Sequence, residues 1–148
     1  MANNDAKICQ YIVVDKKLNM SPGKLCAQIS HASMAFLTNM LRKGIQRTDD
    51  SADVACSVTI PSEIWDGWID GVFTKVVLAA KGRSGLDKVV EKAKENGLVE
   101  GEDFFCIRDN CLTELTPDET GTCFTCIGFK PMPKDVLMPV VGKLQLYR

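Results

Sequence analysis

Short apolar runs alternate with longer amphipathic stretches along this chain. Runs that are rich in β-branched or aromatic residues, and bounded by polar or glycine-containing segments, are typical of buried strands. The four clearest runs are Ile8–Asp15, Phe73–Ala80, Asp103–Arg108 and Thr122–Phe129. We also expect an edge strand or extended segment over Val54–Ile60, and a terminal strand or tail over Lys143–Tyr147.

The stretch after the first run has the pattern of a long helix. Ser21 can cap its amino end, Pro22 suits the first helical turn, and Gly44 can terminate the helix after about Lys43. Apolar residues recur every three or four positions within it, which predicts one face packed on the core. These residues are Leu25, Ile29, Ala32, Phe36 and Met40.

The same signals predict three shorter helices. One is capped by Ser62, one begins around Ser84 and ends at Gly97, and one covers Pro133–Val141. The first of them carries Trp65 and Trp68. On a short amphipathic helix we expect both tryptophans to anchor the core rather than to stack on nucleobases.

The order of these elements predicts an α/β fold. Strand–helix–strand alternation implies right-handed crossovers and parallel strands. The connection Asp109–Gly121 is about a dozen residues long and has no helical pattern, so the fourth strand is expected to be antiparallel. We therefore expect a three-layer α/β/α arrangement with a mixed, mostly parallel sheet of about four strands, in one domain over residues 1–148.

Composition narrows the class of protein without naming a function. The 148 residues include seven cysteines and carry a net charge of −1, which argues against a uniformly basic surface but permits a local basic face. The start of the chain, Met1–Asn4, lacks a basic-then-apolar signal pattern, and no apolar run is long enough to span a membrane. We expect a cytoplasmic protein with free thiols and no membrane association.

The candidate chemistry lies where strands end. Ligands of open α/β sheets bind beyond the carboxyl ends of the parallel strands, which places Lys24 and Asp109 on one rim if their strands are parallel. Gln28 and His31 follow Lys24 at helical spacing and share its face. This trio can line a pocket, or it can form a solvated face with a partly buried, hydrogen-bonded histidine.

Cys123 and Cys126 form a C-x-x-C pair inside an expected strand. Residues three apart on a regular strand point to opposite faces, and no second Cys/His pair has matching spacing. We expect no metal site.

Four segments carry a resemblance to a known family. They are VVDKKLNMSPGKLCAQISHASMAF (Val13–Phe36), KVVLAAK (Lys75–Lys81), IRDNCLTELTPDETGTCFTCIGFKP (Ile107–Pro131) and VGKLQLY (Val141–Tyr147). In this order, and covering nearly the whole chain, they resemble the archaeal/eukaryotic-type (class II) peptidyl-tRNA hydrolases. The resemblance implies an enzyme without cofactor or metal that cleaves the ester between a peptide and the 3′ ribose of its tRNA, and a homodimer is plausible.

The resemblance also implies roles for single residues. The family's lysine falls on Lys24, its aspartate on Asp109 and its first threonine on Thr113. Lys24 would stabilise the oxyanion, Asp109 would orient or deprotonate a water, and Thr113 would position that water or the substrate. Gln28 and His31 would support the site.

Further substrate contacts are expected around the rim. Lys16, Lys17 and Lys81 would hold tRNA phosphates. The family's second threonine falls on Cys123 when counted back from the Ile-Gly pair without a gap. It falls on Thr122 if the extra loop residues follow Thr122.

The chain departs from the family pattern in its acidic overall charge, in the segment Ile45–Pro61, which has no clear counterpart, and at two further places. Leu112 stands where the family usually has an arginine, and the loop Pro117–Thr122 is about two residues longer. These departures keep two alternatives to peptidyl-tRNA hydrolysis open. One is a non-catalytic or altered-specificity module that binds RNA or protein on the same fold, and the other is an esterase- or amidase-like enzyme that uses the same rim.

Overall fold

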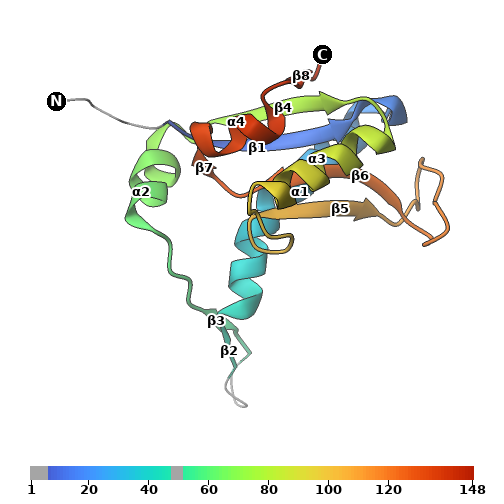
Figure 1. The fold of residues 1–148 in the computed structure, drawn as a ribbon. Helices are drawn as coiled ribbons and strands as arrows, with labels where there is room; N and C mark the ends of the chain where they lie inside the picture. The colour runs from blue at the N-terminus through green and yellow to red at the C-terminus, as the bar shows by residue number, and fades with distance from the viewer. Residues whose placement is uncertain (1–6, 48–51) are drawn as a thin grey trace.

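The computed structural model describes residues 7–47 and 52–148 (Figure 1), so the expectation about Met1–Asn4 lies outside the described residues. The main sheet has six strands in the order β5-β6-β1-β4-β8, with β7 paired to β1 beside this path. Its strands are β1 (Ile8–Asp15), β4 (Lys75–Ala80), β5 (Phe104–Asp109), β6 (Cys123–Phe129), β7 (Met132–Pro133) and β8 (Gln145–Leu146). The α/β class and the mixed sheet are as expected.

The expected antiparallel direction of the fourth strand, β6, is confirmed, whereas the expected number of strands and the mostly parallel pairing were wrong. About four strands were predicted, because a two-residue strand such as β7 leaves no periodic pattern to read, whereas β8 lies within the terminal strand or tail expected over Lys143–Tyr147. Among the ladders of this sheet only β1–β4 is parallel, so the sheet is not mostly parallel. Strand β6 inserts antiparallel between β1 and β5, and β5 runs in the direction of β1 without pairing with it.

Helices pack against both faces of the central strand β1, which is buried along its whole length (Figure 1). Its residues alternate between the faces, as a pleated strand requires. Tyr11 and Val13 pack with α3 (Arg83–Glu95) and α4 (Lys134–Val141). Ile12 and Val14 pack with α1 (Pro22–Lys43). The mainly apolar run that predicted a buried strand reflects this double burial.

Helix α1 has the bounds that the sequence predicted. Its N-cap is Ser21, whose Oγ accepts the Lys24 N–H at 3.4 Å, Pro22 begins the helix, and Gly44 is the C-cap. The helix lies very close to β6 at Gly128, because a Cβ built there would be 2.1 Å from the Ala32 carbonyl oxygen. The absence of a side chain at Gly128 therefore sets how near α1 can approach the sheet.

Other local expectations were wrong in detail. Helix α2 (Ser62–Ile64) is capped by Pro61 and α3 by Gly82, whereas serine caps were predicted. Trp68 is buried with 2% of its surface exposed, but Trp65 is 50% exposed, so only one tryptophan anchors the core. Both belong to the π-helical segment Trp65–Val72, whose wider turn does not follow the spacing of an α-helix.

The segment expected as an edge strand does not join the main sheet. Within it only β3 (Ala55–Cys56) is a strand, and it pairs with β2 (Ile45–Gln46) in a separate hairpin at the end of α1 (Figure 1). No helix among residues 7–47 and 52–148 is long and apolar enough to cross a membrane.

Candidate active site

The predicted rim forms at the carboxyl ends of β1 and β5. Asp109 is the last residue of β5, and Lys24 lies in the first turn of α1, which follows β1. Since β1 and β5 run in the same direction, with β6 between them, these two ends reach the same edge. The charges meet there: Lys24 Nζ lies 2.7 Å from Asp109 Oδ1, and each side chain is 13% exposed.

A chain of hydrogen bonds from buried side chains orients this ion pair. Gln28 donates from Nε2 to Asp109 Oδ1 at 3.1 Å and accepts at Oε1 from the Thr125 hydroxyl at 2.6 Å. Gln28 is 2% exposed, so its amide has little freedom to turn away. The sequence placed Gln28 on the right face but gave no sign of its partner Thr125, which comes from β6.

The second carboxylate oxygen of Asp109 is also engaged. The Cys111 backbone N–H donates to Asp109 Oδ2 at 2.9 Å. Burial would raise the pKa of Asp109, but the hydrogen bonds from Lys24 and Cys111 outweigh it and lower that pKa below its usual range. Asp109 therefore stays ionised at neutral pH, and it is a weak proton acceptor there.

Thr113 is held beside the pair by its own loop. Its Oγ1 accepts from Lys24 Nζ at 3.2 Å. The next residue, Glu114, accepts the Ser21 backbone N–H at 2.9 Å and also the Ser21 hydroxyl. This contact ties the loop to the amino end of α1, and nothing in the sequence pattern indicated it.

A β-bulge decides which side chains of β6 face this site. Ile107 pairs with Cys126, whereas Arg108 pairs with Phe124, so Thr125 is an extra residue in β6. The Thr125 hydroxyl and the Cys126 thiol both contact Gln28 of α1. Beyond the bulge the alternation of side chains is therefore shifted by one residue.

The shift turns Cys123 toward the site and Thr122 away from it. Cys123 pairs directly with Asp109 across the ladder, and cross-strand partners share a face. Thr122 instead contacts Arg108, at 3.3 Å, and Thr120, at 2.7 Å. Burial, followed by the neighbouring Cys111 thiol, raises the pKa of Cys123, so its thiol is protonated at neutral pH.

The bulge also overturns the reason given for excluding a C-x-x-C site. Cys123 and Cys126 lie on the same face of the sheet, not on opposite faces. Burial raises the pKa of Cys126 to about 12, which disfavours the thiolate that a metal needs. Among residues 7–47 and 52–148, no group of three or more His, Cys, Asp or Glu side chains could hold a metal ion.

The remaining expected residues lie around the same edge with different surroundings. His31 is exposed and forms no hydrogen bond within the described residues, which does not match a partly buried, hydrogen-bonded histidine. Lys16 and Lys17 occupy the turn after β1, and Lys81 follows β4. A Cβ at Gly82 would be 3.1 Å from Lys17 Cδ, so this lysine lies across the loop that opens α3.

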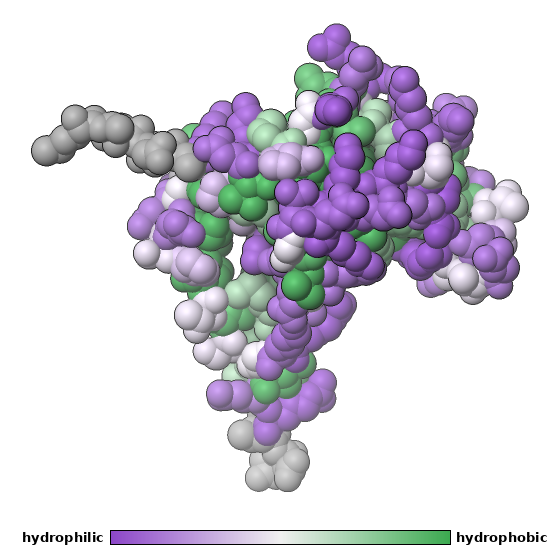
Figure 2. Space-filling model, in the orientation of Figure 1, coloured by the Kyte–Doolittle hydropathy of each residue, from purple (hydrophilic) through white to green (hydrophobic). Residues whose placement is uncertain are grey.

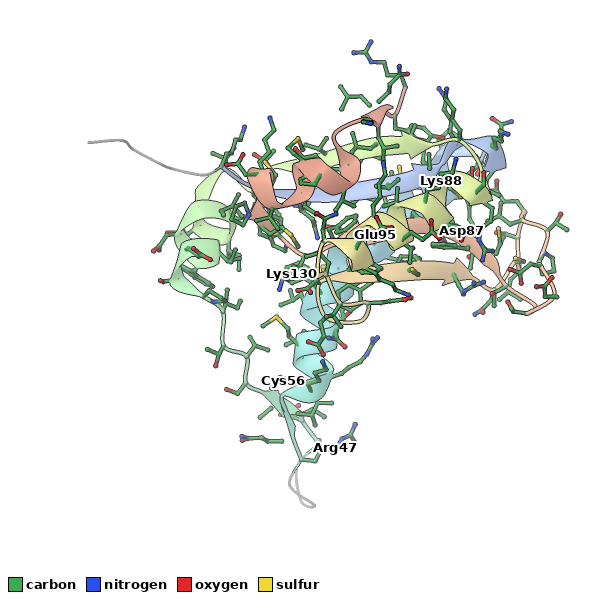
Figure 3. The ribbon with its side chains drawn as sticks, in the orientation of Figure 1. Arg47, Cys56, Asp87, Lys88, Glu95 and Lys130 are labelled. Carbon is green, nitrogen blue, oxygen red and sulfur yellow. The ribbon has the colours of Figure 1, made fainter. Side chains whose placement is uncertain are left out.

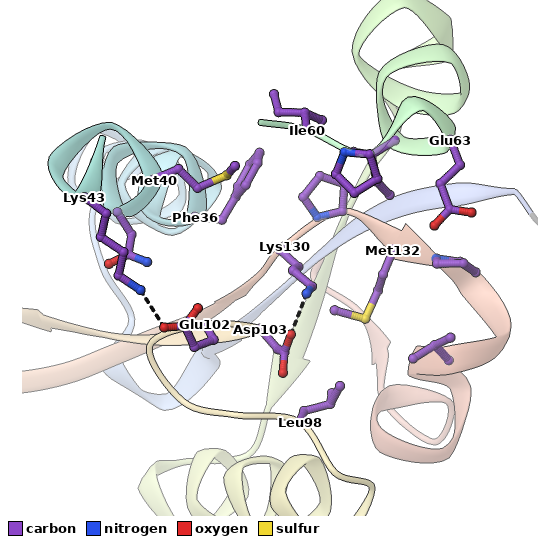
Figure 4. A pocket seen from close by; sticks show the side chains of 16 residues that line it. Phe36, Met40, Lys43, Ile60, Glu63, Leu98, Glu102, Asp103, Lys130 and Met132 are labelled. Carbon is purple, nitrogen blue, oxygen red and sulfur yellow. Dashed lines mark hydrogen bonds and ion pairs between the residues drawn. The ribbon is translucent and has the colours of Figure 1, made fainter. Parts of the chain in front are cut away.

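An apolar hollow of about 460 Å³ lies at the opposite edge of the sheet, between the end of α1 and the start of α4 (Figure 4). Four of the five charged side chains on its wall form ion pairs, Lys43 with Glu102 and Lys130 with Asp103. The hollow is remote from Lys24 and Asp109, so we place the candidate chemistry at the carboxyl edge.

The fold and this edge define a small α/β protein with a polarised Lys–Asp centre. The model of the family "Peptidyl-tRNA hydrolase PTH2" matches residues 8–147, and the chain belongs to that family. Peptidyl-tRNA hydrolase of Methanopyrus kandleri is 36% identical over 140 residues, covering 94% of this chain and 97% of the relative. Peptidyl-tRNA hydrolase of Nanoarchaeum equitans is 29% identical over 136 residues, covering 92% and 96%.

A solved structure supports the fold alone. A protein of unknown function from Agrobacterium tumefaciens has a TM-score of 0.53 and 8% identity to this chain. The match covers 96% of this chain and 98% of that protein.

Proposed function

We propose that this chain hydrolyses the ester bond of peptidyl-tRNA and releases the peptide and the tRNA, with Lys24 and Asp109 at the centre of the reaction. Family membership supports the reaction, and the 2.7 Å contact between Lys24 Nζ and Asp109 Oδ1 is the observation that supports the site. The alternative of an inactive binding module is less favoured, because the family and the relatives that match the chain are named peptidyl-tRNA hydrolases.

Each group has a role that follows from its surroundings. Water adds to the ester carbonyl carbon, and the ribose oxygen then leaves with a proton. Lys24 stabilises the negative charge that develops on the carbonyl oxygen. Asp109 holds Lys24 Nζ in place and orients the water. Its lowered pKa makes it a poor general base. Thr113 and the protonated thiol of Cys123 hydrogen-bond to water or substrate.

Other residues hold this arrangement or the substrate. Gln28 fixes the carboxylate of Asp109 from the core side. His31, Lys16, Lys17 and Lys81 contribute to substrate binding around the edge. No cofactor takes part. Leu112, in the place of the family's arginine, is 89% exposed and supplies no positive charge, so phosphate contacts come from other residues.

Two properties of the whole protein complete the proposal. The enzyme acts in the cytoplasm, where its substrate is made, and it works as a homodimer. Sedimentation at several protein concentrations tests the second statement, and a mass of one chain, 16.3 kDa, at every concentration would contradict it.

A parallel incubation tests the proposed reaction. The purified protein is mixed with peptidyl-tRNA or with free aminoacyl-tRNA, each with and without EDTA. We expect cleavage of only the N-blocked substrate, at the same rate with the chelator. No cleavage of peptidyl-tRNA at micromolar protein would rule the proposal out, and equal cleavage of both substrates would favour a general esterase.

A further inference from the structure

A second groove, of about 440 Å³, lies between α3, the end of β4, and the segment that joins α4 to β8. Its floor is apolar, with Val89 and Val140 among the lining residues. Its lining includes five lysines and no aspartate or glutamate: Lys16, Lys81, Lys88, Lys92 and Lys143. In a chain with a net charge of −1, this is a strong local concentration of positive charge.

The five lysines have no counter-charge within the described residues. Ion pairs neutralise other cations of the molecule, including Lys43, Lys94 and Lys130, but none of the groove lysines takes part in one. One of them, Lys16, lies near an aromatic ring, with its Nζ 5.9 Å from the ring centre of Tyr147. Like charges gathered around one cavity repel, and an anionic ligand with several charges relieves that repulsion.

Helix α3 contributes two lysines to the groove, Lys88 and Lys92. Figure 3 shows Lys88 on the side of α3 nearer β4 and Asp87 on the other side. Asp87 pairs with Arg83 at 2.9 Å, away from the groove lysines. On the face seen in Figure 2, hydrophilic side chains cover most of α3. Of the charged residues of α3, only Lys88 and Lys92 line the groove.

The groove and the active site meet at one edge of the sheet. Asp109 ends β5, Lys81 follows β4, and the strand order places β6 and β1 between them. Three strand spacings of about 4.8 Å give a separation of about 14 Å. The turn that carries Lys16 and Lys17 lies on this route. The site faces α1 and the groove faces α3 and α4, so one ligand that reaches both must bend over the edge.

We propose that this groove binds the phosphodiester backbone of the tRNA substrate next to its esterified 3′ nucleotide. The inference rests on the proposed function. A flexible nucleotide strand can cross the edge with its ester at Lys24 and its phosphates among the lysines. The groove extends along α3 from Ser84 to Lys92, about 12 Å, which is more than a single small anion needs. Lysine contacts to phosphate read no base sequence, which suits an enzyme acting on every tRNA.

Three lysines far from the catalytic pair allow the proposal to be tested. The triple variant Lys88→Gln/Lys92→Gln/Lys143→Gln removes three charges from the groove. The control Lys7→Gln/Lys94→Gln/Lys134→Gln removes three charges elsewhere. Each protein is assayed with peptidyl-tRNA and with a short substrate, an N-acyl-aminoacyl ester of adenosine. Binding of uncharged tRNA is measured by fluorescence anisotropy at several salt concentrations.

For the groove variant we expect a KM for peptidyl-tRNA raised about tenfold or more, with kcat and the rate on the short ester within twofold of wild type. The slope of log affinity for tRNA against log salt should fall by about two to three. Equal KM values for the groove and control variants would overturn the proposal, as would equal loss on the short ester.

The binding measurement separates this proposal from the proposed function. If no protein hydrolyses either ester, wild-type binding of tRNA that is weakened only in the groove variant still supports the groove. Wild-type binding to anionic phospholipid vesicles but not to tRNA would instead identify a membrane contact and overturn the proposal.

Discussion

At the scale of single residues, the site depends on one carboxylate, both of whose oxygens accept hydrogen bonds. Asp109 accepts from Lys24 and Gln28 on one oxygen and from the Cys111 backbone on the other. These donors belong to α1 and to the loop after β5. The carboxylate therefore joins two elements as well as holding charge at the edge.

Removing either member of the ion pair should reduce hydrolysis strongly. We expect Lys24→Ala and Asp109→Ala each to lower kcat/KM by about 10²-fold or more, the scale of losing one positioned electrostatic group. Lys43→Ala, which breaks the exposed pair with Glu102, is the control and should be silent. Circular dichroism checks folding, and wild-type rates in folded Lys24 or Asp109 variants would refute the assignment.

The lowered pKa of Asp109 predicts a pH dependence of stability. A carboxyl group whose native pKa is depressed stabilises the fold above its ordinary pKa, and this contribution is lost as pH falls through the native pKa. The difference in unfolding free energy between wild type and Asp109→Asn should therefore shrink as pH is lowered from neutral into the carboxylate range. Urea titrations at a series of pH values measure it, and a constant difference would contradict the prediction.

The bulge in β6 predicts different roles for two adjacent residues, with Cys123 at the site and Thr122 outside it. Cys123→Thr should retain or raise hydrolysis, because a hydroxyl donates a better hydrogen bond than a thiol. Thr122→Val should be nearly silent in hydrolysis, because Thr122 contacts Arg108 and Thr120 instead of the site. Steady-state kinetics of both variants measure these effects. A Thr122→Val enzyme that loses most activity, beside a normal Cys123→Ser enzyme, would reverse the assignment.

At the scale of elements, the site depends on how closely α1 lies on β6. Lys24 and Gln28 project from α1, whereas Thr125 and Cys123 belong to β6, so their contacts require a fixed distance between helix and strand. Gly128 permits this distance, since only a glycine fits under the Ala32 carbonyl.

A methyl group at Gly128 should force the two elements apart. We expect Gly128→Ala to lower the free energy of unfolding by about 1–3 kcal/mol or more, as in other overpacked interiors. Gly23→Ala is the matched control in α1, because a Cβ there meets nothing within 4 Å, and its stability should be unchanged or slightly higher. Urea unfolding of both variants gives the comparison, and equal stabilities would show that α1 can shift freely.

At the scale of the whole molecule, the chemistry should need no metal ion. The described residues bring no three suitable ligands together, and burial keeps Cys126 protonated. We expect elemental analysis to find no stoichiometric zinc, with hydrolysis unchanged after dialysis against EDTA. One zinc per chain that disappears in the Cys123→Ser/Cys126→Ser variant would overturn this expectation.

The local pattern of the chain was sufficient for the longest helix, the central strand and the rim. The bounds of α1 follow from Ser21, Pro22 and Gly44, since capping depends on residues adjacent in sequence. The mainly apolar run of β1 predicted a buried strand, and the structure buries it on both faces. Lys24 and Asp109 could be placed on one rim because the ends of parallel strands face the same way, and this placement holds although β6 separates the two strands.

Only the tertiary structure decided how distant segments combine. Strand order, the extra residue Thr125 and the burial of Gln28 depend on pairings between segments about 20 to 100 residues apart, and no local pattern encodes their register. The lysine groove gathers charges from the turn after β1, from the β4 end, from α3 and from the segment before β8. The net charge of −1 gave no sign of this groove, because a total charge carries no information about where folding brings the charges together.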